Sequence, residues 1–402
     1  MAKKDQIEHA HEEKLIRYLF FLFGFGVMAW VPRMPEVKEN LGLENGAFGS
    51  LLSSGSLGAL FGLLSVGHVI HKIGVKKVLI SSILLLFGSL AMLVHITSSF
   101  TFLVLNIAFG FGITAMHVAI NSQAFHYQER SGANIVTRAH GVWSAGALLT
   151  AIISGALVGH VSLATHIDVL AFGCAIAMLM IVSQLHPALL PANENDDDSY
   201  SIKQIFTSFK VDWPITLGLA CASYLEFAVG DWGTIFTKER LGIDSGLSTV
   251  PYILFTAAMI FGRFMIHRLT DKYEIDGLVK KSALLAGLSF GSCIIIATHL
   301  PASMKWWSYG LFVLGFLMAG LGLSFLGPTF FAIANRRSTQ PSAVVIGQLG
   351  VANNILMFIC KWLVAWTIQF TGSIALAFMI PTAMVIATVF FTRALRPEER
   401  KN

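Results

Sequence analysis

The chain has 402 residues, of which 55% are hydrophobic and only 13% are charged, and its mean hydropathy is +0.69. A soluble domain carries roughly 25% charged residues, so this composition excludes a water-soluble globular protein. The formal net charge of +5 comes from the chain ends and from short connectors between apolar runs, and it does not indicate a nucleic-acid partner.

Twelve apolar runs follow one another along the chain, and each is about as long as a membrane crossing requires. About 20 apolar residues in a helix cover roughly 30 Å of hydrocarbon. The sequence therefore predicts an all-α polytopic membrane protein with twelve transmembrane helices. The predicted spans are 15–31, 46–70, 78–95, 101–125, 139–160, 166–186, 213–237, 247–269, 278–299, 306–334, 344–370 and 373–393.

The polar first fourteen residues lack the apolar core and cleavage site of a secretory signal, so we expect a cytoplasmic tail at 1–14. Basic residues divide the connectors into two alternating sets, and one set holds only five of the 28 Lys and Arg residues. Cytoplasmic connectors retain basic residues, which predicts that both termini are cytoplasmic and that the protein lies in the cell (inner) membrane. The five residues are Arg33, Lys38, Lys238, Arg240 and Lys305.

Two stretches of the chain nearly repeat each other at an offset of 200 positions: Lys38–Gly46 reads KENLGLENG and Lys238–Gly246 reads KERLGIDSG. The same offset relates Gly62 to Gly262 in the apolar run that follows each copy. An internal repeat of this kind predicts two homologous six-helix bundles, an organisation known from secondary transporters. The predicted parts after the tail are a bundle at 15–186, a cytoplasmic linker at 187–210, a second bundle at 211–393 and a cytoplasmic tail at 394–402.

A patterned connector, here called the gating loop, follows the second span. It consists of Gly67, His71, Lys72, Gly74, Lys76 and Lys77. The pattern resembles the signature Gly-x-x-x-Asp-Arg-x-Gly-Arg-Lys of the major facilitator superfamily, with His71 where the family prefers Asp. Asp271 and Lys272 restore the acid and the base in the second half. The resemblance implies the major facilitator fold and a loop that locks one conformation by charge contacts, while the alternative is a solvated basic loop that anchors the helix.

A narrower resemblance covers most of the chain. The segments Trp30-x-x-Arg33-x-Pro35, Val118-Ala-Ile-Asn121, His140-Gly-x-x-Ser144 and Glu226-x-x-x-x-Asp231-Trp232 occur in this order. Their order and spacing are similar to a bacterial branch related to rhizopine-transport proteins, with fucose permeases as more distant relatives. That branch shows an acid just before its Val-Ala-Met-Asn segment, where this chain has His117, so a coupling role of that acid does not carry over unaltered. The resemblance implies a sugar or a sugar derivative as the solute.

The fourth span carries a stripe of polar or small residues whose offsets of 4, 4, 3 and 4 place them on one helix face. The stripe consists of Asn106, Gly110, Thr114, His117 and Asn121. Polar residues inside a membrane most often line interiors or pathways. We therefore expect Asn106, Thr114, His117 and Asn121 to line a water-filled cavity and bind the substrate, and the alternative is a polar contact between helices.

Glu226 lies near the middle of the seventh span, where a charged side chain costs roughly 2.5 to 3.5 kcal/mol on insertion scales. The carboxyl group must therefore be neutral, paired or hydrated, and a proton that comes and goes meets this condition. We expect Glu226 to carry a coupling proton, with Asp231 and His117 as further candidates, and the alternative is a structural glutamate. Its helix face is continued by Ser223, a substrate-binding candidate, and by Gly230 and Thr234.

Asp231 lies five residues after Glu226 and therefore about 140° around the helix, so the two carboxylates do not form a tight pair. Lys361 in the eleventh span lies at a similar depth and shares a face with Asn354. We expect a structural ion pair between Asp231 and Lys361, and the alternative is direct contact with the substrate, for which Asn354 is another candidate. Arg263 in the eighth span is expected to snorkel or to pair locally.

Gly327 and Pro328 predict a kink in the tenth helix, because proline lacks the backbone donor and glycine is permissive. Such a kink suits a gate, and the alternative is an ordinary proline of a membrane helix.

Four tryptophans lie at the predicted outer ends of helices, where an aromatic belt at the membrane interface is the default. They are Trp30, Trp232, Trp306 and Trp307. Trp30 and Trp232 also flank the predicted cavity, so we regard them as candidates to stack on a sugar ring.

The sequence contains no phosphate-binding loop, no Gly-x-Ser-x-Gly elbow and no metal-binding pair of histidines. We therefore expect no enzyme activity, no cofactor and no metal site. The four cysteines lie inside apolar runs without metal-ligand spacing and are expected to be free thiols. The fifth span lacks the adjacent Gly-Pro pair that is typical of many drug and proton exchangers, and this favours import.

We therefore expect a monomeric secondary active transporter whose two bundles rock around a midplane site and take up a small polar solute with a proton. Its expected partners are the solute, protons and the lipid bilayer. The alternatives are a proton-coupled exporter of drugs or metabolites and a membrane sensor that does not transport.

Overall fold

The computed structural model describes residues 2–131, 135–185, 211–243, 246–270, 272–338 and 342–396, and every regular element in these ranges is a helix. Eleven helical segments among them are long and apolar enough to cross a membrane. The helix α9 (Trp213–Leu241) has 29 residues but is not one of the eleven, because Glu226 and Asp231 lower its hydropathy. Counting α9, the described segments match the twelve predicted spans, and the predicted all-α polytopic fold is confirmed.

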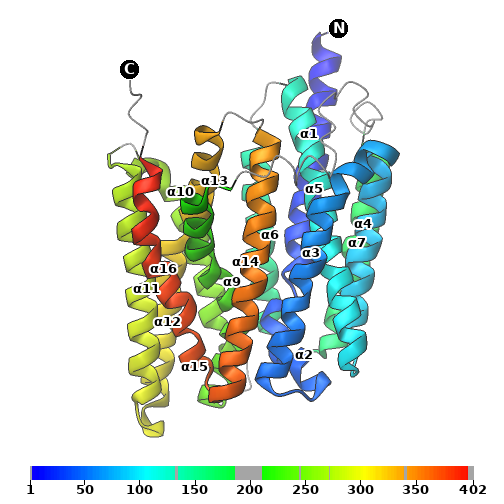
Figure 1. Cartoon of the computed structure of the whole chain (residues 1–402). Helices are drawn as coiled ribbons and strands as arrows, with labels where there is room; N and C mark the ends of the chain where they lie inside the picture. Colours follow the sequence, from blue (N-terminus) through cyan, green and yellow to red (C-terminus); the bar gives the residue numbers. More distant parts are fainter. Residues whose placement is uncertain are drawn as a thin grey trace. The chain divides into compact units, whose positions relative to one another are not determined.

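The described residues fall into two compact units. Unit 1 takes its residues from Met1–Gly42 and Leu51–Ser208, and its long helices run side by side (Figure 1). The elements of unit 1 are α1 (Ala2–Val27), η1 (Val31–Arg33), α2 (Met34–Leu41), α3 (Asn45–Ile73), α4 (Val75–Leu93), α5 (Ser99–Ser131), α6 (Ile135–Leu157) and α7 (Leu163–Gln184).

Unit 2 takes its residues from Phe209–Asn402 and from the short segment Leu43–Ser50, which includes the first turn of α3. In addition to α9, its elements are η3 (Gly246–Thr249), α10 (Val250–Thr270), α11 (Ile275–His299), η4 (Ala302–Met304), α12 (Lys305–Leu323), α13 (Leu326–Arg337), α14 (Ser342–Thr371), α15 (Ile374–Ala377), α16 (Met379–Phe391) and η5 (Thr392–Leu395).

The first predicted span differs from the structure at both of its ends. The helix α1 begins at Ala2, inside the region expected to be a tail, and ends at Val27. The connector that follows is not an extended loop, because it folds into η1 and α2. Pro32 and Pro35 occupy the first turns of these two elements, where the missing proline N–H leaves no hydrogen bond unmade.

The repeated sequence marks the same helix end in both units. Gly42 ends α2 with φ +62°, and Gly242 ends α9 with φ +58°, so both adopt the left-handed conformation of a helix C-cap. The backbone N–H of Gly42 donates to Glu39 O, and that of Gly242 donates to Lys238 O. Only glycine adopts this conformation without steric cost, which explains why the repeat preserves glycine at this point.

The repeat also preserves a close contact between two helices in each unit. A Cβ atom added to Gly110 of α5 would lie 2.0 Å from Gly55 O of α3, and one added to Gly320 of α12 would lie 2.1 Å from Phe255 O of α10. Two turns later on α3 and α10, Gly62 faces the Thr114 side chain and Gly262 faces the Ser324 side chain. Small residues let the backbones of membrane helices approach each other, and here they bring the α3–α5 and α10–α12 pairs into equivalent contacts.

The tenth predicted helix is broken instead of kinked. The helix α12 ends at Leu323, and α13 begins at Leu326 after Phe325, whose φ and ψ are −122° and −1°. Gly327 and Pro328 therefore lie in the first turn of α13, where proline is tolerated. The predicted interruption is present, but it lies a few residues earlier in the chain than Gly327 and Pro328.

Candidate functional site

The carboxylate of Glu226 on α9 faces the guanidinium of Arg263 on α10. Glu226 Oε1 lies 3.8 Å from Arg263 Nη2, so the two groups form an ion pair that is longer than a hydrogen bond. Both side chains are partly exposed, 38% for Glu226 and 34% for Arg263. The intramembrane carboxylate therefore has a cationic partner and remains accessible, two conditions under which a charge at this depth is tolerated.

The break in the tenth helix holds Arg263 in place. Arg263 Nε donates to Ser324 O at 2.9 Å, and its Nη2 lies 3.6 Å from Met259 Sδ. Because α12 ends just before Ser324, carbonyls at this point lack intrahelical partners and carry partial negative charge. Arg263 thus connects the broken helix to Glu226. Of the two interpretations of Arg263, snorkelling and local pairing, the structure has local pairing.

Asp231 and Lys361 join α9 to α14. Asp231 Oδ2 lies 2.7 Å from Lys361 Nζ, and the two side chains are only 18% and 15% exposed. Lys361 Nζ also lies 5.7 Å from the ring centre of Phe227. The short distance makes this a charge-assisted hydrogen bond. Because Glu226 and Asp231 face different cations, each carboxylate belongs to a separate charged site.

A cluster of polar side chains joins α5 to α6 in unit 1. His140 Nε2 lies 3.1 Å from Asn121 Oδ1, and Asn121 Nδ2 donates to His117 O at 2.8 Å. An amide oxygen only accepts hydrogen bonds, so His140 carries a proton on Nε2. The ring centre of His117 lies 6.0 Å from that of His140. The predicted residues His117 and Asn121 therefore lie together with His140, which was predicted only as part of a motif.

Two phenylalanines of α1 form an aromatic side to this cluster. Phe20 meets the His140 ring edge-on with ring centres 5.2 Å apart, and the ring centre of Phe23 lies 6.4 Å from that of His117. The His117 side chain is exposed, and Asn121 and His140 are half-buried. Phe20 and Phe23 are themselves only 0% and 2% exposed, so they pack behind the cluster and are not available to stack on a solute. The accessible groups are the His117 imidazole and part of the Asn121 amide, and a few placed hydrogen-bonding groups of this kind suit a polar compound.

The polar stripe of the fourth predicted span is divided between two roles. Asn106 and Thr114 are only 3% and 8% exposed. Asn106 Nδ2 donates to two backbone carbonyls of α3 at 3.1 Å each, and Thr114 packs against Gly62. These two residues form the contact between α3 and α5, which was the alternative interpretation, and their burial argues against the expected role in substrate binding.

Two of the four tryptophans are exposed and two are buried. Trp306 and Trp307 are 64% and 75% exposed, as an interface belt requires. Trp30 is buried against Phe109 and Trp232 is buried in unit 2, so neither is part of a belt. Their burial corrects the expectation that these two indoles are available to stack on a sugar ring.

The remaining substrate candidates lie in unit 2. Ser223 is half-buried one turn before Glu226, and its hydroxyl donates to Leu219 O at 2.7 Å. Asn354 of α14 is half-buried, and its Nδ2 donates to Gly350 O at 3.1 Å. Thr234, expected to continue the same face, is only 1% exposed. The accessible part of the Glu226 face therefore runs over Ser223, Glu226 and Gly230 and ends before Thr234.

The gating loop lies at the end of α3 and the start of α4. Gly74 connects the two helices with φ +82°, and Gly67 is exposed within α3. The charged or titratable members are all exposed: His71, Lys72, Lys76 and Lys77. In unit 2, Lys272 is also exposed, whereas Asp271 lies outside the described residues. The predicted lock remains a prediction.

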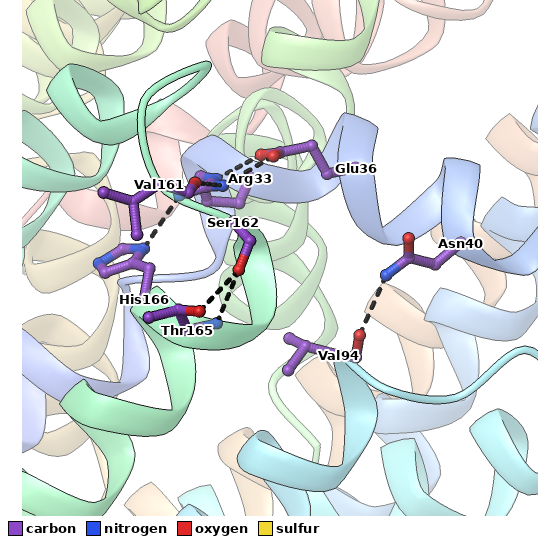
Figure 2. Close-up of polar contacts among 8 residues, drawn as sticks. All are labelled: Arg33, Glu36, Asn40, Val94, Val161, Ser162, Thr165 and His166. Atoms are coloured by element: carbon purple, nitrogen blue, oxygen red, sulfur yellow. Dashed lines mark hydrogen bonds and ion pairs between the residues drawn. The ribbon is translucent and has the colours of Figure 1, made fainter.

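A buried arginine in unit 1 was not among the predicted site residues. Arg33 is 0% exposed, and it forms a two-pronged contact with Glu36, in which Nη2 and Oε1 are 2.7 Å apart (Figure 2). Its Nη2 also donates to Val161 O at 2.8 Å. A glutamate three residues after an arginine, next to Pro35, was the available sequence signal, but it did not show that the pair is buried.

His166 of α7 completes this cluster and shows its protonation state. Arg33 Nη1 lies 3.3 Å from His166 Nδ1. A guanidinium has only donors, so Nδ1 must accept, and His166 is the neutral tautomer with its proton on Nε2. The cluster fastens η1 and α2 to α7, and it explains how a charge from the connector before α3 can be fully buried.

Long apolar helices that carry partly exposed ion pairs within their spans indicate a polytopic membrane protein with a functional site inside the membrane. Residues 18–360 match the family model described as Major Facilitator Superfamily. The chain belongs to this superfamily, as its loop motif predicted, and it is a transporter and not an enzyme.

Similar proteins agree with this assignment. An uncharacterized MFS-type transporter of Yersinia pestis is 25% identical over 83% of this chain and 83% of its own length. The membrane protein MosC of Rhizobium meliloti is 24% identical over 94% of this chain and 89% of its own length.

Two solved structures share the fold. A mutant form of the nucleoside transporter NupG has a TM-score of 0.78 at 15% identity and covers 96% of this chain and 100% of its own. A D-xylose-proton symporter has a TM-score of 0.73 at 14% identity and covers 97% of this chain and 98% of its own.

Proposed function

We propose that this transporter takes up a small polar solute, a sugar or a sugar derivative, together with a proton that is carried by Glu226. The observation that carries the proposal is the partly exposed Glu226–Arg263 ion pair, 3.8 Å long, in the middle of a membrane helix. A carboxylate that is accessible and only loosely paired is placed to gain and lose a proton.

The geometry around Arg263 suggests how such a proton is coupled to a change in structure. With Glu226 charged, the guanidinium lies between a carboxylate and the Ser324 carbonyl at the break between α12 and α13. Protonation of Glu226 removes one of these two attractions, so Arg263 is then held by the helix end alone. The position of the broken helix relative to α9 therefore depends on whether Glu226 carries a proton.

The proposed solute class rests on the surface in unit 1. His117, Asn121 and His140 offer hydrogen-bonding groups, and the buried rings of Phe20 and Phe23 pack against the two imidazoles. The two structural neighbours are a nucleoside transporter and a D-xylose-proton symporter, and nucleosides and D-xylose are both polar ring compounds. We use these two classes as the first probes.

Transport by purified protein in sealed vesicles tests the proposal. An inward proton gradient should drive accumulation of the solute by the wild type. In Glu226→Gln, which keeps the size but removes the titrating group, accumulation should disappear while exchange at equal solute concentrations survives, because exchange does not require release of the proton.

The matched control is Glu44→Gln, which removes an exposed carboxylate from the connector before α3. This variant should accumulate solute like the wild type. Normal gradient-driven accumulation by Glu226→Gln would reject the assignment and leave Asp231 and His117 as the candidates.

The same vesicles separate the alternatives. A proton-coupled exporter moves solute against an oppositely directed gradient, and a membrane sensor binds solute without moving it in either direction. Accumulation that follows the inward gradient contradicts both.

We further propose an inner-membrane protein with both termini cytoplasmic that functions as a monomer. Single cysteines at Glu44 and Lys76 test the orientation, because both positions are exposed and lie at opposite ends of α3. Glu44 comes just before α3, and Lys76 lies in the first turn of α4, which follows it. An impermeant thiol reagent added to intact cells should label the first position and not the second. The reverse pattern would overturn the orientation.

A further inference from the structure

A pocket of about 570 Å³ lies in unit 2, where α9 and α11 end and the chain turns from α14 into α15. This volume is within the range of about 300 to 1,000 Å³ that is typical of small-ligand sites. Phe236, Ile294 and Ile374 form its floor, and each is 6% exposed or less. The pocket is separate from the Glu226 and Lys361 sites, and none of their residues line it.

The rim of the pocket carries two adjacent and opposite charges. Glu239 and Arg240 follow each other at the end of α9, and both are exposed. Arg240 Nη2 donates to Thr298 O at the end of α11, where helix carbonyls lack intrahelical partners. Glu239 Oε2 accepts from Asn45 Nδ2 at 2.8 Å. These contacts hold a cation and an anion next to each other at the mouth of the pocket.

A third polar group on the rim has a defined hydrogen-bonding role. His299 Nδ1 lies 2.8 Å from Ile295 O, a carbonyl that only accepts, so Nδ1 is the donor. In the neutral imidazole Nε2 is then an acceptor, and the His299 side chain is exposed at the rim. The rim therefore combines a guanidinium with two acceptors, the Glu239 carboxylate and the His299 imidazole.

One side of the pocket is apolar and open. Ile295 and Leu376 line the pocket, and they are 50% and 52% exposed. Both residues belong to segments long and apolar enough to cross a membrane, where exposed aliphatic side chains meet lipid chains. A ligand that matches this pocket needs a zwitterionic head and an apolar body.

We propose that the pocket binds an ethanolamine phospholipid, with its phosphate at Arg240, its ammonium group at Glu239 and an acyl chain along Ile295 and Leu376. The guanidinium fork suits a phosphate, and an ammonium group can donate N–H bonds to a carboxylate. A choline headgroup has no N–H to donate, and a glycerol headgroup has no positive charge for Glu239. The pocket therefore prefers ethanolamine lipid to either of these lipids.

Lipid retention by the purified full-length protein tests this proposal. The protein is stripped of lipid in detergent, mixed with equal amounts of ethanolamine, choline and glycerol phospholipids of identical chains, and analysed by native mass spectrometry. The wild type should retain the ethanolamine lipid in preference to the other two. Arg240→Gln and Glu239→Gln should each weaken its binding about tenfold, the loss of one charge-assisted hydrogen bond of roughly 1.4 kcal/mol.

The matched controls are Arg268→Gln and Glu44→Gln, which remove exposed charges that do not line the pocket. Both should retain the wild-type preference. Glycerophosphoethanolamine, the headgroup without chains, should bind far more weakly than the whole lipid, and equal binding would show a soluble phosphate ester site instead. Equal retention of the three lipids by the wild type would overturn the proposal even if the pocket variants fail to fold.

Discussion

Unit 1 and unit 2 contain the same helix contact but different polar groups beside it. Gly110 meets the backbone of α3 at Gly55, and Gly320 meets the backbone of α10 at Phe255, in both cases with room for no side chain. The helix pairs that carry these contacts differ next to them. The helix α5 continues unbroken past Thr114, whereas α12 ends just before Ser324 and leaves the Ser324 carbonyl to accept from Arg263.

The charged residues of unit 2 have apolar counterparts in unit 1. At the repeat offset of 200, Glu226 corresponds to Gly26 and Arg263 corresponds to Leu63. A Cβ atom at Gly26 would lie 2.4 Å from Phe87 Cε1, so unit 1 has no space for a carboxylate there. The duplicated framework determines how the helices pack, and the residues that break the repeat give α9 and α10 of unit 2 their charges, while unit 1 has histidine and amide side chains around His117.

Removing one partner of the Asp231–Lys361 ion pair of unit 2 should cause the largest loss of stability. Lys361→Ala leaves Asp231 mostly buried without its partner, and we expect a loss on the order of 3 kcal/mol, measured as a lower apparent melting temperature in detergent. Combining it with Asp231→Ala should recover part of the loss. Additive damage in the double variant would show that the two residues do not stabilise each other.

The shared helix contact should respond equally in both units. Gly110→Ala and Gly320→Ala each force a methyl group into a neighbouring backbone, at a cost of about 1 to 3 kcal/mol. Gly88→Ala and Gly310→Ala are the controls, because an added Cβ meets nothing within 4 Å at either position. Thermal unfolding should separate the two pairs, and a harmless Gly320→Ala would contradict the equivalence of the contacts.

Arg263→Leu gives unit 2 the residue that unit 1 has at the equivalent position, Leu63. The change leaves Glu226 and the Ser324 carbonyl without their common partner, and we expect about 1 to 3 kcal/mol of destabilisation. Gradient-driven accumulation should fall more than solute binding does. Leu63→Met is a mild change at the equivalent position and serves as the control, and equal transport by Arg263→Leu and Leu63→Met would contradict a role of Arg263 in coupling.

The two repeated helix ends should give the smallest effect. Gly42→Ala and Gly242→Ala place a side chain in the left-handed region, at a cost of roughly 1 to 2 kcal/mol each. Asparagine tolerates this conformation better, so Gly42→Asn and Gly242→Asn should lie between alanine and the wild type in apparent melting temperature. Alanine variants as stable as the wild type would show that these ends are not constrained.

Several site residues show where prediction from the chain succeeds and where it stops. The contact of Asp231 with Lys361 was predicted, because two opposite charges at one depth of a membrane have few other partners. Asn106 and His117 lie on one stripe, yet Asn106 is buried against α3 and His117 is exposed. Helical periodicity tells which residues share a face, but it does not tell where a neighbouring helix covers that face.

The sequence by itself determined the membrane location, the number of spans, the duplicated organisation and the superfamily. Hydropathy, repeat spacing and loop motifs can be recognised along the chain without knowing which helices pack together. Tertiary structure decided which intramembrane charges meet. Arg263 lies 37 positions after Glu226, and Ser324 lies a further 61 positions on, so their contacts depend on how α9, α10 and α12 pack. The same holds for Arg33, whose burial requires α7 to supply His166 and the preceding turn to supply the Val161 carbonyl.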